Sequence, residues 1–171
     1  ATAGESRATA TGGFLFTHHG CSGPAVLEIS HIVARARQDN LPAQVRICWT
    51  RHNAAAWRQL LHTAAARPLL AVLRAELPER LAAMLCVISG LAPEQSVAQL
   101  RNEERQRLIA NLTEFELPGT TDGGYAAAEV TSGGVALADI NPATMASRKQ
   151  PGLYLAGELL DVFGLIGGYN L

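Results

Sequence analysis

The chain has 171 residues, of which 48% are apolar and 17% are charged, with a formal charge of −1. This composition excludes intrinsic disorder and allows one sizeable core or two small ones. Because the 14 basic and 15 acidic residues include no Lys or Arg block, we expect no nucleic-acid partner. No apolar run approaches the ~20 residues that span a bilayer, so we expect a soluble, cytoplasmic protein without a membrane partner.

The cysteines and the chain ends give two further expectations. Cys21, Cys48 and Cys86 are widely spaced and odd in number, which is typical of buried thiols in a reducing cytosol and not of a disulfide framework. The chain begins at Ala1 without a methionine and ends inside a glycine-rich motif. We therefore expect a fragment of a longer protein.

The first third of the chain predicts strands around a helix. Residues 12–18 follow a Gly-Gly turn and carry aromatic side chains, which favours a short strand. Pro24 suits the first turn of a helix whose apolar positions continue at helical spacing to Arg37. Apolar and polar residues then alternate over 43–50, the pattern of a half-buried strand.

The middle of the chain predicts a helical bundle over residues 53–114. Ala, Leu, Arg, Gln and Glu dominate there, and prolines divide the pattern. We expect Trp49 and Trp57 to pack in the core, and the charge run 101–107 to be a solvated helix face. The expected helices lie near 53–66, 68–76, 78–89 and 96–114, with Asn53 and Ser96 as N-caps and Gly90 as a helix stop.

After residue 118 the pattern returns to strands and turns. Short strands are expected within 125–131, 132–140 and 152–157, with Tyr125 and Tyr154 packed inward. The order is thus β-rich, helical and β-rich. It predicts a helical block inserted within a sheet domain.

Residues 17–23, THHGCSG, raise two catalytic alternatives. A zinc site needs about four ligands, but the other histidines lie without a paired metal-binding frame. The nucleophile elbow G-x-S-x-G is absent, because the spacing in GCSG is wrong. We therefore interpret this stretch as a tight turn between a strand and a helix, and expect no metal site.

The end of the chain suggests a ligand site. A strand that stops at Gly157 would present Glu158 at its carboxyl end, where open α/β sheets bind ligands and where a carboxylate can accept hydrogen bonds from a polyol. Gly167 and Gly168, before Tyr169, would let backbone N–H groups approach a ligand. The alternative is purely structural: a glutamate at a strand end, followed by a glycine-rich turn.

Two stretches resemble a known family. Residues 129–171, EVTSGGVALADINPATMASRKQPGLYLAGELLDVFGLIGGYNL, resemble the carboxy-terminal signature of bacterial FAD-dependent flavoproteins of the NAD(P)/FAD-utilizing dehydrogenase or aminoacetone oxidase-like type. Residues 12–30, GGFLFTHHGCSGPAVLEIS, resemble a second recurrent stretch of that family. The resemblance implies an α+β fold. In it, residues 1–120 form an insert domain, with a small β-barrel (strands in 12–50) and a helical bundle (53–114), and 121–171 form the C-terminal part of an FAD-binding α/β domain.

The resemblance also implies a cofactor site. FAD would bind in the full-length protein, and NAD(P)H and a small-molecule substrate would be its redox partners. The chain contains no G-x-G-x-x-G loop, so the N-terminal half of the FAD domain would be missing and the isolated chain would be inactive and hold no FAD. The residues implied to contact FAD are Thr131, Gly133, Gly134, Val135, Gly157, Glu158, Gly167, Gly168, Tyr169 and Asn170.

No side chain is a convincing catalytic acid, base or nucleophile, which fits an enzyme whose flavin carries the redox chemistry. Phe163 departs from the family, which commonly has an acidic residue there. An alternative function is a non-catalytic module that binds a partner or covers a substrate, without a cofactor of its own.

Overall fold

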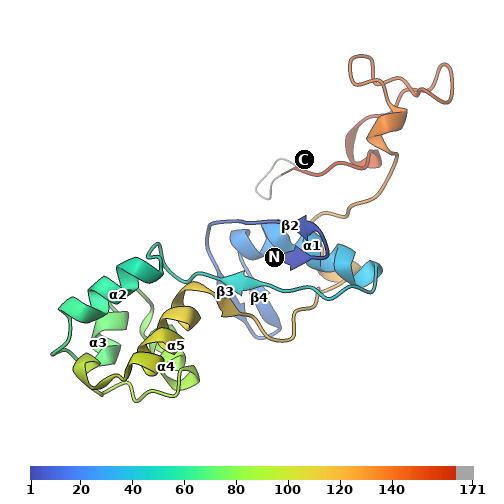
Figure 1. Cartoon of the computed structure of the whole chain (residues 1–171). Coiled ribbons are helices and arrows are strands. Elements are labelled where there is room, and N and C mark those ends of the chain that lie inside the picture. Colours follow the sequence, from blue (N-terminus) through green and yellow to red (C-terminus); the bar gives the residue numbers. More distant parts are fainter. Residues whose placement is uncertain (165–171) are drawn as a thin grey trace. The chain divides into compact units, whose positions relative to one another are not determined.

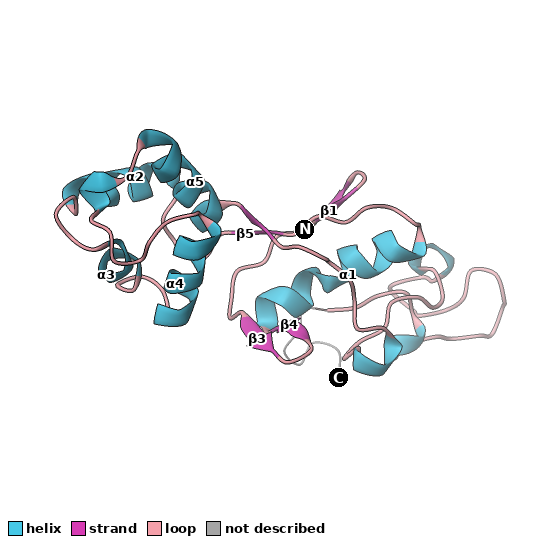
Figure 2. Ribbon diagram, turned by 90° about the horizontal axis from the view of Figure 1, so that it is seen from below, coloured by secondary structure: helices cyan, strands magenta, loops and turns pink. Residues whose placement is uncertain are grey.

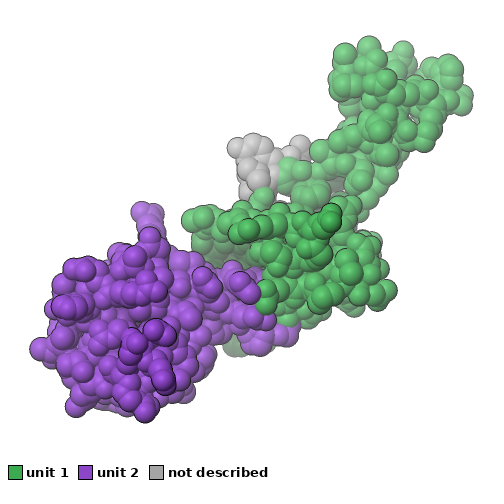
Figure 3. Space-filling view, viewed as in Figure 1, with its two compact units in different colours: residues 1–44, 120–171 green, residues 45–119 purple. Residues whose placement is uncertain are grey.

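The computed structural model of the chain describes residues 1–164. It divides into two compact units (Figure 3): residues 1–44 with 120–171, and residues 45–119. Short strands and longer helices and loops make up both units (Figure 2). Among the described residues, no helix is both long and apolar enough to cross a membrane.

The first unit contains two small hairpins and one long helix. β1 (Thr2–Ala3) pairs antiparallel with β2 (Ser6–Arg7), and β3 (Leu15–Thr17) pairs antiparallel with β4 (Gly20–Ser22). The helix α1 (Pro24–Gln38) begins at the predicted proline and packs Ile32 and Ala36 against Ala3. The predicted strand within 12–18 and the helix to Arg37 are confirmed.

The predicted β-barrel is not closed in residues 1–164. The strands form three sheets of two strands each, in the order β1-β2, β3-β4 and β5-β6. Each strand is two or three residues long, shorter than the commonest length of about 5–6 residues. Beyond these pairs only isolated bridges occur, such as that between Thr2 and Gln44, so the strands of residues 1–164 form no continuous ring of hydrogen bonds. The mixed α and β content of the prediction is confirmed.

Four helices make up the second unit (Figure 1), as the sequence predicts. They are α2 (Ala54–Thr63), α3 (Leu69–Leu73), α4 (Glu79–Ile88) and α5 (Asn102–Thr113), with a short 3-10 helix (Val97–Gln99) before α5. The Asn53 side chain accepts a hydrogen bond from Ala56 N–H, and Ser96 caps the 3-10 helix. Gly90, with φ of 70°, follows the end of α4. The predicted roles of Asn53 and Gly90 are confirmed, whereas Ser96 caps the short 3-10 helix and the predicted helix over 96–114 begins only at Asn102.

The core of this unit is aliphatic around one tryptophan. Trp57 and Leu61 of α2 are fully buried with Leu108 and Leu112 of α5. Trp49 is partly buried against this cluster, so the predicted core packing of both tryptophans is confirmed. The buried Ser89 joins two helices: its Oγ accepts from Asn111 Nδ2 at 2.9 Å and its carbonyl accepts from Arg107 Nε at 2.8 Å.

The two ends of the helical unit are paired. β5 (Arg46–Ile47) lies antiparallel to β6 (Phe115–Glu116). Leu117 N–H donates to the Val45 carbonyl at 2.9 Å, and Trp49 N–H donates to the Leu112 carbonyl at 3.1 Å. The helical block therefore leaves and returns at one place, as an insertion does. The predicted strand over 43–50 is shorter than expected.

The strands predicted after residue 118 are wrong. Residues 125–127, 137–139 and 157–159 form 3-10 helices, and 152–157 contributes one isolated bridge, between Tyr154 and Ala146. Tyr125 and Tyr154 are 77% and 67% exposed, so neither is packed inward. β-propensity describes how well a side chain suits a paired, half-buried surface. Among the described residues these segments form only isolated bridges, so they offer no paired, half-buried sheet surface on which such side chains could pack.

We predict that Leu85→Ala lowers the free energy of unfolding by about 2–5 kcal/mol, because Leu85 is 1% exposed and truncation leaves a cavity. Its neighbour Met84 is 55% exposed on the same helix, so Met84→Ala is the matched control, with an expected change within about 0.5 kcal/mol. Urea titration followed by circular dichroism measures both. Equal losses in the two variants would contradict the assignment of the core.

The thiols should differ in reactivity. Cys86 is buried, and this burial together with the nearby charge of Glu94 raises the pKa of its thiol to about 11. Cys48 is exposed, so the prediction that it is a buried thiol is wrong. The thiolate is the reactive form. We predict that a thiol reagent at pH 8 labels Cys48 first and that Cys48→Ser removes this fast phase of labelling. Cys86 should stay protonated and react slowly even at pH 9.

The control is Cys21→Ser, which should keep the fast phase. Fast labelling of Cys86 would contradict the prediction.

Candidate functional site

The structure brings two of the predicted cofactor segments together, both within the first unit. Val135 N–H donates to the Leu159 carbonyl, and Asp161 N–H donates to the Val135 carbonyl, each at 2.9 Å. Val135 and Leu160 form an isolated parallel bridge. The segment 133–135 therefore lies beside the turn that carries Gly157 and Glu158, although 22 residues separate Val135 from Gly157 in sequence.

Gly134 makes the closest approach between these segments. Its φ is +139°, and a Cβ added there would lie 2.5 Å from the Leu159 carbonyl oxygen. That oxygen accepts the Val135 hydrogen bond and cannot move away without breaking the bridge. Gly134 is therefore required by backbone packing.

Gly157 and Glu158 form an exposed turn. Residues Gly157–Leu159 are a 3-10 helix, and Leu160 N–H donates to the Gly157 carbonyl at 3.0 Å. Gly157 has φ of +76°, and an added Cβ would meet nothing within 4 Å. The Glu158 side chain is exposed and has no hydrogen-bond or ion-pair partner among residues 1–164. Its carboxylate oxygens are free to accept hydrogen bonds from a ligand.

Asp161 is a site residue that sequence reasoning missed. Its Oδ1 accepts from Gly133 N–H at 3.0 Å, which fixes the glycine pair against the second segment. No motif in the sequence marks this residue, because the contact joins positions 28 residues apart. Thr131 is exposed, and it takes no part in this hydrogen bond.

The other predicted residues, Gly167, Gly168, Tyr169 and Asn170, lie outside the described residues. Contact of the whole predicted set with the flavin stays a prediction.

Phe163, the residue that departs from the family, has a structural contact. Its ring centroid lies 5.3 Å from that of His31 on α1, with the planes at 53°. The His31 Nδ1 lies 2.9 Å from the Glu28 carbonyl oxygen, which orients the ring. Offset aromatic pairs at this separation stabilise packing. An acidic side chain at 163 would lose this ring contact.

The THHGCSG stretch is a hairpin followed by a helix. The Thr17 hydroxyl accepts from His19 N–H and donates to the Gly20 carbonyl, which closes the turn between β3 and β4. Gly23 approaches Gly13 so closely that an added Cβ would lie 2.6 Å from its carbonyl oxygen. The predicted tight turn is present, but it joins two strands, since Gly20–Ser22 forms β4 before the helix begins at Pro24. Within residues 1–164, no group of three or more His, Cys, Asp or Glu side chains is arranged to hold a metal ion.

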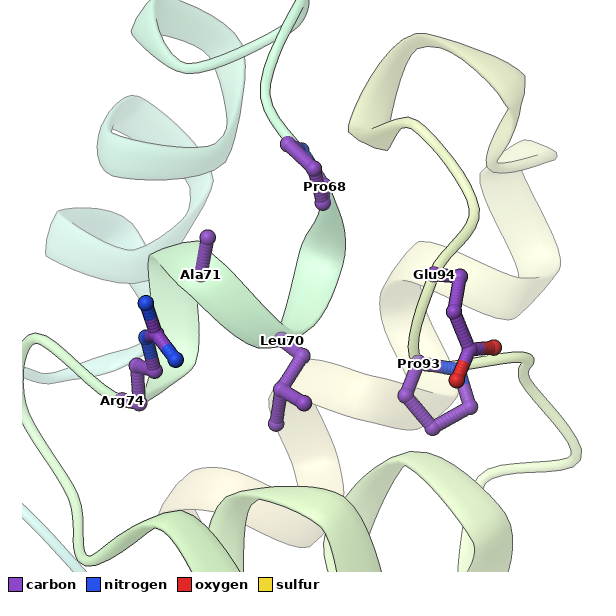
Figure 4. A pocket seen from close by; sticks show the side chains of 6 residues that line it. All are labelled: Pro68, Leu70, Ala71, Arg74, Pro93 and Glu94. Carbon is purple, nitrogen blue, oxygen red and sulfur yellow. The ribbon is translucent and has the colours of Figure 1, made fainter.

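The helical unit has a shallow groove of about 260 Å³ (Figure 4). Its lining residues come from α3, from the proline before it and from the turn after α4: Pro68, Leu70, Ala71, Arg74, Pro93 and Glu94. None of these is a predicted cofactor residue. The volume lies below the range of about 300–1,000 Å³ that is usual for small-molecule sites. The groove therefore does not suit a dinucleotide.

Comparison with known proteins identifies the family. Residues 1–130 match the model of the HI0933-like protein barrel and H2TH domain. The match covers most of the chain, and the chain belongs to this family. The resemblance seen in the sequence is thereby confirmed.

Curated relatives extend the similarity past residue 130. The chain is 38% identical over 161 residues to the ribosomal RNA dihydrouridine synthase of Escherichia coli, and 33% identical over 156 residues to that of Haemophilus influenzae. Each alignment covers 91% of this chain and 38% of the relative. A 3-dehydro-bile acid delta(4,6)-reductase of Clostridium scindens is 31% identical over 166 residues, covering 94% of this chain and 41% of the reductase. The chain thus spans about two fifths of the length of these relatives.

We predict that Gly134→Ala opens the contact between the two segments. The added methyl group meets a backbone oxygen that is held by a hydrogen bond, so the bridge must separate. Amide hydrogen exchange at Val135 and Asp161 should become at least about tenfold faster, equivalent to about 1.4 kcal/mol of local stability. Gly133→Ala is the matched control, because its φ is also positive but an added Cβ meets nothing. Equal effects in both variants would contradict the packing role.

Proposed function

We propose that the chain is part of an FAD-dependent oxidoreductase, in which residues 131–135 and 157–158 form one wall of the flavin site. The observation that carries the proposal is the backbone pairing of 133–135 with 159–161, beside the exposed Glu158. Two segments that the family resemblance assigns to the same ligand thus lie side by side.

The residues present have the chemistry that FAD needs. The Glu158 carboxylate, exposed and without a partner in the described part of the chain, can accept hydrogen bonds from the hydroxyls of the ribityl chain. Gly133 and Gly157 leave open space where a side chain would stand, so a ligand can approach the backbone closely. FAD itself would supply the hydride chemistry, while these residues bind and orient it.

The relatives differ in what they act on. Two carry the name of a ribosomal RNA dihydrouridine synthase and one that of a bile acid reductase. All three names denote enzymes that catalyse an oxidation or a reduction, and their substrates are very different. Family membership therefore supports the reaction class and leaves the substrate open, with NAD(P)H as the proposed source of reducing equivalents. A module without its own cofactor remains the second candidate, because the matched family domain alone accounts for residues 1–130.

We predict that Glu158→Ala weakens FAD retention in the full-length protein. Loss of a charged acceptor costs about 1–3 kcal/mol, which corresponds to a dissociation constant raised about 5- to 160-fold. Flavin fluorescence after ultrafiltration measures the bound fraction. The control is Glu5→Ala, which removes another exposed carboxylate from the β1–β2 turn.

Unchanged FAD affinity in the Glu158 variant would remove this residue from the site. A full-length protein that purifies without flavin, and takes up none when FAD is added, would overturn the proposed function as a whole.

A further inference from the structure

The outer face of α4 (Figure 1) is apolar and exposed. Met84, Val87 and Ile88 are 55%, 63% and 48% exposed. Their spacing of three and four residues sets them on one side of the helix, which we call the α4 face. Within residues 45–119 these three are all of the large apolar side chains that are exposed. The helical unit thus gathers its exposed apolar side chains on one helix.

The neighbouring helices present polar groups to solvent instead. The exposed side chains of α2 include Arg58, Gln59 and His62. On α5 the charge run 101–107 is largely exposed, as the sequence predicts. By contrast, the sequence has no charged residue from Leu81 to Pro93. An apolar patch within a polar surround is typical of an interaction surface.

The fold of the helical unit does not explain the α4 face. The inner side of α4 already supplies the core with Ala82, Leu85 and Cys86. Valine and isoleucine are weaker helix formers than the alanine, leucine and arginine around them, so helix propensity does not favour them at exposed positions. Methionine is common at binding surfaces because its side chain adapts to the partner. The composition of this face therefore fits contact with another protein surface.

Two opposite charges border the α4 face, one near each end of the helix. Arg80 is exposed in the first turn of α4, and Glu94 is exposed after the helix ends at Ile88. Within residues 1–164 neither side chain forms a hydrogen bond or an ion pair. Burial and then the charge of Glu94 raise the pKa of the Cys86 thiol, so this carboxylate lies near the C-terminal half of α4.

This order of charges is complementary to itself when the helix is reversed. Arg80 and Ile88 lie four residues to either side of Met84, about 6 Å along the helix axis. A two-fold axis at Met84 would therefore set Arg80 of one copy beside the C-terminal end of the other α4, near Glu94 of that copy. Symmetry repeats the contact at the opposite end. The negative end of each helix dipole would also face an arginine.

We propose that the α4 face binds the same face of a second copy of this chain, in an antiparallel, two-fold contact that pairs Arg80 of each copy with Glu94 of the other. A patch of this size is smaller than a standard interface of about 20–30 residues a side, so the dimer dissociates at about 10–100 μM. None of these residues belongs to the predicted flavin site. The proposal is therefore independent of the proposed function.

Sedimentation velocity of the 171-residue chain, from about 1 to 200 μM, tests for the dimer. Val87→Glu should raise the dissociation constant at least about tenfold, because two carboxylates would enter the apolar contact. Unchanged circular dichroism shows that this variant is folded. The matched control is Arg58→Glu, which changes an exposed residue of α2 and should leave the dissociation constant unchanged.

Reversing the bordering charges tests the identity of the partner. Arg80→Glu alone and Glu94→Arg alone should each raise the dissociation constant at least about tenfold, since like charges then meet at both ends of the contact. An equimolar mixture of the two variants should dimerise again, because opposite charges meet in the mixed pair. The same recovery is expected when one chain carries both substitutions.

Three outcomes would overturn the proposal. They are a chain that stays monomeric up to about 200 μM, a dimer that Val87→Glu leaves intact, and a mixture of the charge variants that fails to associate. A monomeric chain would assign the α4 face to a different partner. Flavin takes no part in these measurements, so their failure leaves the Glu158 result independent.

Discussion

The antiparallel pairing of residues 45–47 with 115–117 is the constraint on which the rest of the structure depends. It closes a loop of some 70 residues, whose chain entropy must be offset by what the loop buries. The offset comes from the aliphatic core around Trp57, which α2 and α5 build from opposite ends of the loop. Because the ends meet, residues 1–44 and 120–164 belong to one unit despite their separation in sequence.

This closure also explains why charge is best counted by unit. An insertion with its own core has its own surface, and its surface charge is set by its own residues. The whole-chain charge of −1 is the sum of a basic helical unit and an acidic remainder.

The sequence predicted the helices far better than the late strands, for a physical reason. Helical hydrogen bonds and caps are local, so Asn53, Ser96 and Gly90 specify element ends from their immediate neighbours. A strand requires a partner that the local sequence does not contain. Leu153 and Tyr154 have the side chains of a buried strand, yet both are exposed in a segment with one isolated bridge. Their composition reflects a preference that only pairing can satisfy.

The candidate site shows the same division between local and distant information. The unusual backbone at Gly133, Gly134 and Gly157 could be anticipated from the glycines themselves, because positive φ favours glycine at all three positions and a close backbone approach requires it at Gly134. The contact from Gly133 N–H to Asp161 was not predictable, since it joins residues 28 positions apart through a side chain that no motif marks. Gly134 has to be a glycine because of Leu159, not because of a ligand. A glycine-rich signature therefore combines two demands: Gly134 holds the two segments together, while Gly133 and Gly157 keep the backbone open beside Glu158. Substitutions at these glycines should for that reason not be treated as equivalent probes of cofactor binding.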